Sequence, residues 1–317
     1  MNVFVKMMMR TLLGVLFCMV FSLPLQVSAA PSEEDMQFLK DVYQAENQQN
    51  GGAVQQRLTV LSPYAKAAGN VSFYGDWKPA LLLKGEAAGY YITLAGVEKR
   101  GQVPFYLEQT EDHMTIYYQL TKNWEKITIP AKLADVNALM KEQAQEIPAL
   151  IKDVQNVSED ETQRTMLLTL DGNQLAELIR QAQAVQQKAL PANATPEQKK
   201  MREQQDKFME LVMTSLGDLE YSITVDKSTK LVTTASMDLT QPAHRIAHAF
   251  LASDLMTLKP EQKEVCQCLV DSCQLKLDVT CVNPKTGNPE KVTIPEEVKQ
   301  AKEVSMSPDK TGSKNSK

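Results

Sequence analysis

The sequence has no excess of basic charge and little glycine or proline. Its 34 Lys+Arg are outnumbered by 39 Asp+Glu, and the net charge of -5 argues against electrostatic binding to nucleic acid or to anionic lipid surfaces. With 13 glycines and 15 prolines in 317 residues, the chain does not have a fibrous composition. Because 43% of its residues are hydrophobic, it is also too apolar to be disordered as a whole.

Motifs of common catalytic sites are missing as well. The sequence contains no G-x-S-x-G, no P-loop, no G-x-G-x-x-G and no H-E-x-x-H. Of the three histidines, His113 beside Asp112 is interpreted as a surface residue. His244 and His248 are four positions apart, but the cysteines that follow lack the usual C-x2-C spacing of a zinc knuckle. We therefore expect no enzyme, no metal and no cofactor.

An export signal is indicated at the start of the chain. Lys6 and Arg10 accompany an apolar stretch over 12–21, and Val27-Ser28-Ala29 offers the small residues that signal peptidase reads. The apolar run is shorter than the ~20 residues of a membrane-spanning helix. We predict a signal peptide over 1–29 and an exported protein, periplasmic or extracellular, without a stable transmembrane anchor.

Four cysteines follow the predicted signal, and an even cluster in an oxidising compartment predicts two disulfides. Alternating residues over 273–281 predict a strand, which would hold Cys273 and Cys281 ~26 Å apart, far beyond the ~6 Å between Cα atoms in a disulfide. That bridge is excluded, and with it Cys266–Cys268. Two pairings stay open: Cys266–Cys273 with Cys268–Cys281, or Cys266–Cys281 with Cys268–Cys273.

Hydrophobic spacing predicts a chain that switches repeatedly between helix and strand. We expect a helix over 32–49, a meander of antiparallel strands between 70 and 130, and a helix over 133–147 that continues briefly to 154. The later part of the chain predicts strands over 164–170, 221–225, 231–239 and 273–281, and helices over 174–187, 196–216 and 242–258, whereas 259–270 is ambiguous.

These segments predict one domain of the α+β class. The hydrophobic period alternates without a long linker, which favours a single domain over 30–303. Residues 304–317 are polar and basic, and we expect a disordered tail there. The predicted architecture is an antiparallel sheet with helices gathered on its apolar face.

Three stretches resemble the unclosed β-barrel proteins of the LolA-like lipoprotein-carrier superfamily, especially exported members from Firmicutes-type bacteria. They are Tyr117-Tyr118 followed by Asn123-Trp124-Glu125-Lys126, the hairpin over 221–231 with Asp226-Lys227-Ser228-Thr229, and Val292-Thr293-Ile294-Pro295-Glu296-Glu297-Val298. Their order and spacing cover nearly all of the chain after the signal. The resemblance implies a curved antiparallel sheet, an unclosed half-barrel, wrapped around helices packed on its concave face.

The resemblance also implies a function. Members of known role carry acyl chains of lipoproteins or lipids across an aqueous envelope space. We expect a non-enzymatic envelope protein that binds an apolar or lipidic ligand, such as a lipid or acyl chain, in a cleft between sheet and helices. The expected lining residues are Met114, Ile116, Tyr118, Ile223, Val225, Leu275 and Leu277.

A second interpretation stays open. The same fold with a filled core would be a structural or protein–protein interaction module of the cell envelope, and the Gln-, Glu- and Lys-rich helices over 181–207 would form its interaction face. The sequence identifies no protein partner. In either case we expect a monomer that binds no nucleic acid.

Overall fold

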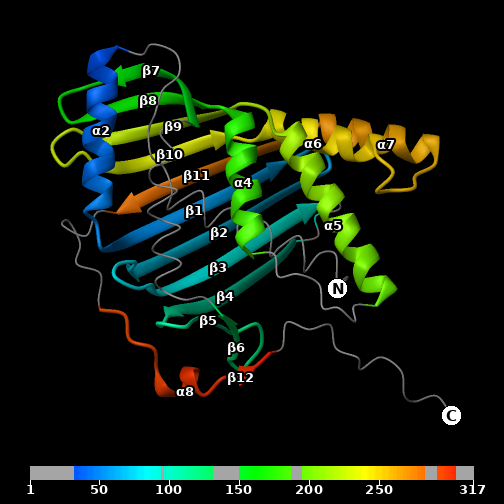
Figure 1. Ribbon diagram of the computed structural model, residues 1–317, viewed down its shortest axis with the longest axis horizontal. Helices are drawn as coiled ribbons and strands as arrows, with labels where there is room; N and C mark the ends of the chain where they lie inside the picture. Colours follow the sequence, from blue (N-terminus) through cyan, green and yellow to red (C-terminus); the bar gives the residue numbers. More distant parts are fainter. Residues whose placement is uncertain are drawn as a thin grey trace.

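The computed structural model describes residues 32–93, 96, 98–130, 150–186, 195–282 and 291–304 (Figure 1). The strands are β1 (Gly51–Leu61), β2 (Ala65–Asp76), β3 (Leu82–Thr93), β4 (Glu98–Gln109), β5 (His113–Tyr118), β6 (Glu125–Pro130), β7 (Ile151–Glu159), β8 (Gln163–Leu170), β9 (Leu219–Asp226), β10 (Val232–Asp238), β11 (Gln274–Val282) and β12 (Lys302–Glu303). The helices are α2 (Glu33–Asn47), α4 (Gly172–Gln186), α5 (Pro196–Ser215), α6 (Thr240–Ala252), α7 (Pro260–Asp271) and α8 (Glu296–Lys299).

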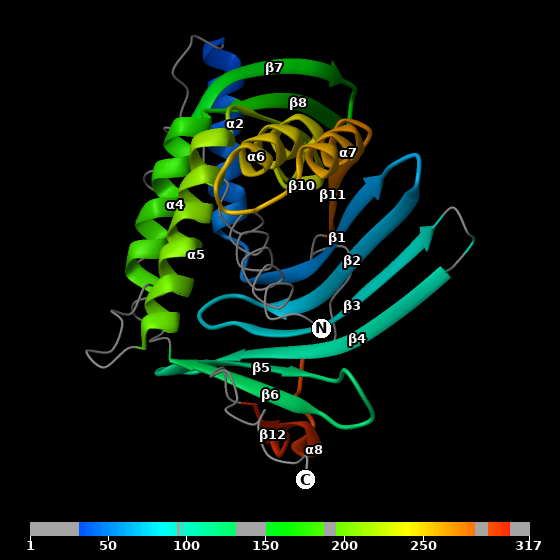
Figure 2. The same ribbon diagram turned by 90° about the vertical axis from the view of Figure 1, so that its right-hand side faces the viewer.

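All twelve strands belong to one sheet, in the order β12-β6-β5-β4-β3-β2-β1-β11-β10-β9-β8-β7. Every pair is antiparallel except the short parallel pair of β12 and β6. The order begins with β12 and ends with β7 without returning to its start, and the sheet curves around the helices (Figure 2). The predicted α+β architecture, an unclosed half-barrel with helices on its inner side, is confirmed.

Helix α2 shows how local sequence and core packing agree. The side chain of Ser32 accepts a hydrogen bond from the backbone N–H of Asp35, and three acidic residues occupy the first turn, where the helix dipole favours negative charge. The opposite face buries Phe38, Leu39 and Val42. Burying each such side chain contributes about 1.5–3 kcal/mol. The predicted helix over 32–49 is therefore confirmed to within two residues.

A buried arginine fixes α2 against the sheet. The side chain of Arg164 on β8 is 6% exposed and forms an ion pair with Asp35, whose side chain is 14% exposed. Its guanidinium also lies 4.8 Å from the ring centroid of Phe38 and 3.5 Å from the Glu159 carboxylate. Removing one partner of a buried ion pair leaves the other charge without compensation and destabilises the protein. The start of α2 is therefore held on β8 by electrostatics as well as by apolar packing.

The Arg164→Met substitution is expected to lower the free energy of unfolding by about 3–5 kcal/mol, because it leaves the Asp35 carboxylate without its partner. Urea unfolding followed by circular dichroism measures this loss. The matched control is Arg180→Met, since Arg180 pairs with Glu177 and Glu210 while 40% exposed and should cost less than about 1 kcal/mol. Equal effects of the two substitutions would contradict the assignment.

The C-terminal segment packs on the outer face of the sheet. Val292, Ile294 and Val298 share a buried cluster with Tyr106 and Tyr117. Burial, and then the neighbouring Glu108, raise the pKa of Tyr117 to about 12. The Ile-Pro-Glu-Glu stretch thus contributes to a second apolar core, outside the barrel (Figure 2).

The structure corrects several of the predicted elements. Strand β1 and the first five residues of β2, 65–69, were not predicted, although β1 lies in the middle of the sheet between β2 and β11. The segment from Ile151 to Val154 was predicted to continue a helix, but it forms the beginning of β7. Helix α6 ends at Ala252 instead of continuing to 258, and the ambiguous stretch forms α7. The predicted signal peptide, the helix over 133–147 and residues 305–317 lie outside the described residues.

No helix within the described ranges is long and apolar enough to span a membrane.

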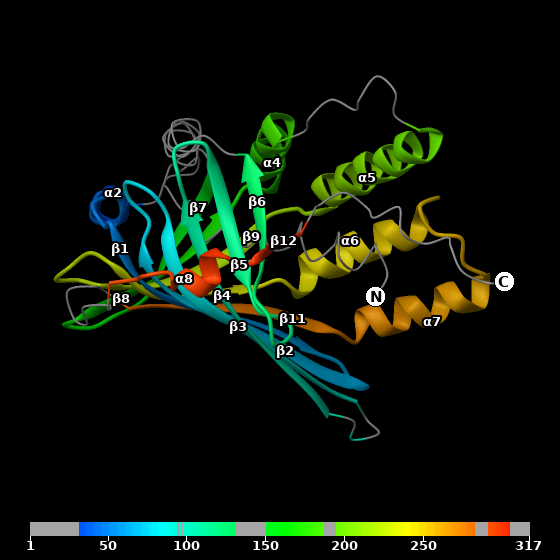
Figure 3. The same ribbon diagram turned by 90° about the horizontal axis from the view of Figure 1, so that it is seen from below.

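The four cysteines are free thiols in the structure, so neither predicted pairing is present. Both pairings required Cys281 to reach a cysteine on α7. Seven strand steps of ~3.3 Å separate Gln274 from Cys281, and α7 lies beyond the Gln274 end of β11 (Figures 1 and 3). Cys281 therefore lies some 20 Å away from the end of the strand to which α7 is connected.

Candidate ligand-binding site

One part of the concave face is filled by helices. Val54, Phe73 and Leu107, on β1, β2 and β4, belong to the main buried core. Leu39 of α2 and Leu175 of α4 pack into the same core. Close packing of this kind leaves little room for a ligand.

The other part of the concave face, toward the β1–β2 and β3–β4 hairpin turns, is less well covered. Leu58, Val71 and Val103 point to the same side as the core residues but are only half-buried. Strand alternation places Ala87 and Gly89 on this side too, in line with the buried Leu83. Burial thus decreases along the strands from the helix-covered part toward the hairpin turns.

Three glycines form a row across this less covered part. Gly69, Gly89 and Gly101 lie directly opposite one another on β2, β3 and β4. A Cβ atom added at Gly69 or Gly101 would meet nothing within 4 Å, and one at Gly89 would lie 3.6 Å from the nearest atom. At Gly85, in the filled part, it would lie 2.5 Å from the Phe105 ring. We call Gly69, Gly89 and Gly101 the glycine row; all three are exposed, and among the described residues no side chain lies within 4 Å of a Cβ added to any of them.

All seven predicted lining residues lie on the concave side, but in different surroundings. Ile223, Val225 and Leu277 are 3%, 0% and 3% exposed and belong to the filled core. Met114 and Ile116 are half-buried at the border of that core. Tyr118 and Leu275 are also half-buried; Tyr118 lies opposite Phe105, and Leu275 lies opposite Val60.

The prediction did not include the residues around the glycine row. Leu58 lies on a strand that was not predicted, and Val71 lies at the start of the predicted meander, where no alternating set of residues was assigned. The signal that could have revealed the row is glycine inside a strand, which often marks a bend or a close approach of another group. Gly69 and Gly89 are twenty positions apart and Gly89 and Gly101 are twelve apart, and each pair is centred on the turn between its two strands, so antiparallel pairing makes the glycines meet.

An unusual carboxyl group lies at the end of α2 on the concave side. Glu46 accepts a hydrogen bond of 2.7 Å from the backbone N–H of Val232. Burial raises the pKa of Glu46, and the hydrogen bond only partly opposes this. Burial, followed by the Glu46 charge, raises the pKa of Cys281 to about 12, and burial also raises the pKa of Tyr221. These groups indicate a low-dielectric interior next to α2.

The Glu46→Gln substitution is expected to stabilise the protein increasingly as the pH rises. A raised pKa in the folded state means that the carboxylate form is the costly one, so the native protein loses stability as the pH rises through that pKa. The difference in Tm between variant and native protein should be near zero at the lowest pH and positive at neutral pH. Thermal unfolding across the pH range measures it.

The control is Glu46→Ala, which removes the acceptor for the Val232 N–H and should be about 1–3 kcal/mol less stable than Glu46→Gln at every pH. A Glu46→Gln variant that is less stable than the native protein at neutral pH would contradict the assignment.

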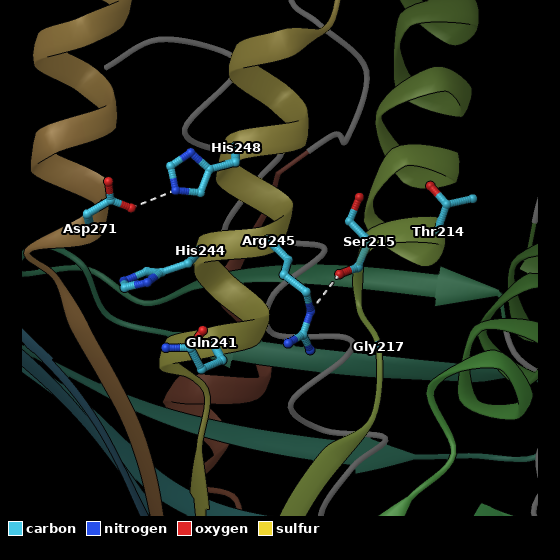
Figure 4. Close-up of a pocket in the computed structure, with 8 residues that line it drawn as sticks. All are labelled: Thr214, Ser215, Gly217, Gln241, His244, Arg245, His248 and Asp271. Atoms are coloured by element: carbon cyan, nitrogen blue, oxygen red, sulfur yellow. Dashed lines mark hydrogen bonds and ion pairs between the residues drawn. The ribbon is translucent and has the colours of Figure 1, made fainter.

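A polar groove crosses α6 on another part of the molecule (Figure 4). Its volume is about 590 Å³, and its lining residues are Thr214, Ser215, Gly217, Gln241, His244, Arg245, His248 and Asp271. Its charged groups are already engaged in holding helices together. His248 contacts the Asp271 carboxylate at 2.6 Å, His244 contacts the Cys273 carbonyl at 2.7 Å, and Arg245 donates to carbonyls at the end of α5.

The groove therefore fits a structural role for its side chains. In the part of the chain that the structure describes, no three His, Cys, Asp or Glu side chains are arranged to hold a metal ion. The apolar surface around the glycine row is the stronger candidate for a ligand site, since it offers unfilled space beside half-buried side chains.

Comparison with solved structures gives a structural likeness, whereas the sequence comparisons do not. No protein-family model matches the sequence, and no curated protein matches it. The structure is similar to the crystal structure of LprF from Mycobacterium bovis, with 12% sequence identity and a TM-score of 0.36; the match covers 85% of this chain and 99% of LprF. Geometric similarity at this level does not place the chain in a family.

Proposed function

We propose that this protein is a non-enzymatic carrier that holds an apolar or lipidic ligand, such as an acyl chain, between the sheet and the helices. The observation that carries the proposal is the open space above the glycine row, in a face that is otherwise apolar. An acyl chain placed there would remove Leu58, Val71 and Val103 from water. Each CH2 group of the chain that becomes buried would contribute ~0.8 kcal/mol.

The shape of the site favours a chain-like ligand. Three neighbouring strands, ~4.8 Å apart, present backbone without side chains, which leaves a floor about 10 Å across. The half-buried Met114 and Ile116 lie on β5 opposite Gln109 and Leu107, at the helix-filled end of β4, and in this proposal they support the site from the border of the filled core. In this proposal Ile223, Val225 and Leu277 support the site from within the filled core, and Tyr118 and Leu275 lie at its border.

The substitution Gly101→Leu tests the proposal. It should fill the open space and lower the affinity for a fluorescent fatty-acid probe at least tenfold, because the loss of a few buried CH2 groups at ~0.8 kcal/mol each amounts to more than 1.4 kcal/mol. Fluorescence titration of the purified mature protein measures the Kd. Stability should not fall, since Gly101 has a negative φ and nothing within 4 Å of the added Cβ.

The matched control is Gln102→Leu, which adds the same side chain to the neighbouring, exposed position on the outer face of β4. This variant should bind the probe like the native protein. A native protein that binds no probe, or equal losses in the two variants, would contradict the proposal and favour the alternative of an interaction module with a filled core.

The cellular place of this function follows from the start of the chain. We propose that residues 1–29 direct export and are removed, and that residues 30–303 act as one domain in the periplasm or outside the cell. Lys6, Arg10 and Val27-Ser28-Ala29 support this proposal. The protein recovered from the envelope or medium of an expressing bacterium should have the intact mass of a chain that begins at Ala30.

A further inference from the structure

The exposed large apolar side chains gather at one end of the molecule. Six of the eight in the described residues lie at the β1–β2 and β3–β4 hairpins or on α7 and the turn before it: Leu61, Tyr64, Tyr91, Met256, Val265 and Leu269. The other two are Leu120, in the turn between β5 and β6, and Val157, on the edge strand β7. Leu61 is paired with Gln274, three residues after α7, so the hairpins and α7 belong to the same end of the sheet (Figure 3).

The two hairpins extend beyond the helices at this end (Figure 2). The β1–β2 turn is held rigidly, because the Ser62 side chain accepts hydrogen bonds from the backbone N–H groups of Tyr64 and Ala65 at 3.2 and 3.0 Å. Tyr64, 54% exposed, is thus presented on an ordered tip. Tyr91, 41% exposed, lies near the end of β3.

Basic residues stand directly beside these apolar ones. Lys66 is paired with Leu61 across the first hairpin, and Lys99 is paired with Tyr91 across the second. Arg100 lies next to Lys99 and has an ion pair with Glu98. The two hairpin ends therefore carry three cationic side chains and one acidic one between them.

Apolar and aromatic side chains interspersed with lysines suit one kind of partner. At the surface of a bilayer, tyrosine rings lie at the level of the headgroups, and long basic side chains reach the phosphates while their stems stay in apolar surroundings. We propose that the hairpin tips, defined as Leu61, Tyr64, Lys66, Tyr91 and Lys99, dock on a membrane surface that contains anionic lipid.

The net charge of the chain does not oppose this contact. Its charge of -5 is spread over the whole molecule, whereas electrostatic attraction at a bilayer acts over a Debye length of ~10 Å at 0.1 M salt. Within that range the hairpin ends themselves carry Lys66, Lys99 and Arg100 against Glu98, and the acidic residues of α7 lie behind them. The expectation from total charge, which argued against anionic lipid surfaces, is revised for this one surface.

The hairpin tips lie close to the glycine row along the strands, which relates the membrane contact to the proposed function. Gly69, Gly89 and Gly101 lie three or four residues from the ends of β2, β3 and β4 that form the tips. Docking would bring the less covered part of the concave face close to the bilayer, where an acyl chain could pass between them. This relation rests on the proposed function, whereas the membrane contact itself does not.

The experiment is flotation of the mature protein with vesicles of phosphatidylcholine and phosphatidylglycerol in equal parts, and with vesicles of phosphatidylcholine alone. The native protein should float with the anionic vesicles and be released by high salt. The Lys66→Glu/Lys99→Glu variant should lose at least ~25-fold in partition coefficient, about fivefold for each lysine removed. The Leu61→Ser/Tyr64→Ser/Tyr91→Ser variant should lose at least tenfold.

The matched control is Val157→Ser, which changes an exposed apolar residue on β7, at the other edge of the sheet, and should float like the native protein. Quenching of tryptophan fluorescence provides an independent measurement. With the anionic vesicles, brominated lipid should quench the tryptophan introduced by Tyr64→Trp and leave the one introduced by Val157→Trp unaffected.

Failure of the native protein to float with anionic vesicles, or an equal loss in the control, would overturn the docking surface. Quenching of both tryptophans alike would overturn it too. The fatty-acid titration without vesicles separates this result from the proposed function. The tip variants should bind the probe normally, and a protein that floats but binds no probe would refute the carrier function while leaving the docking surface intact.

Discussion

The structure depends on the need to cover the apolar face of a strongly curved sheet. A twelve-strand sheet that does not close on itself exposes its whole concave side unless other elements pack there. Helices α2 and α4 meet this need over one part of the sheet, where Leu39, Val225 and Met166 have no exposed surface. Over the part that contains the glycine row, the described helices do not complete the cover.

The filled part gives the fold its rigidity. Arg164 joins the start of α2 to β8, and Glu46 joins its last turn to β10, so both ends of α2 are tied to the sheet by a charged group. Such buried charges stabilise little by themselves but are costly to separate. An interior that is held firmly on one side can leave space on the other without collapse. This division of the concave face is the physical basis of the proposed carrier role.

Sequence patterns predicted the elements whose apolar residues alternate regularly or lie on one helical face. Strand β9, with Tyr221, Ile223 and Val225 inward, is an example. Strand β7 was taken for helix because a bulge between Ile151 and Asp153 leaves Ile151 and Val154 both buried with a spacing of three, as in a helix. Helix α7 was ambiguous because it buries none of its residues completely and so has no clear apolar face.

The candidate site was only partly predictable for the same reason. The concave orientation of Met114 and Ile116 could be predicted because they alternate on a regular strand. Gly69, Gly89 and Gly101 carry no side chain and give no hydrophobic signal, so their meeting on one face follows only from the register of three strands. The disulfide pairings were misjudged because sequence proximity of four cysteines does not show that α7 and the far end of β11 lie apart.

The most direct test of the central claim is a crystal structure of the mature protein grown with a bromine-labelled fatty acid, with the bromine located by anomalous scattering. The account predicts an anomalous peak on the concave side of β2 to β4, in contact with the glycine row. A bound fatty acid whose bromine lies on the outer face of the sheet or in the polar groove across α6, with the glycine row unoccupied, would contradict it.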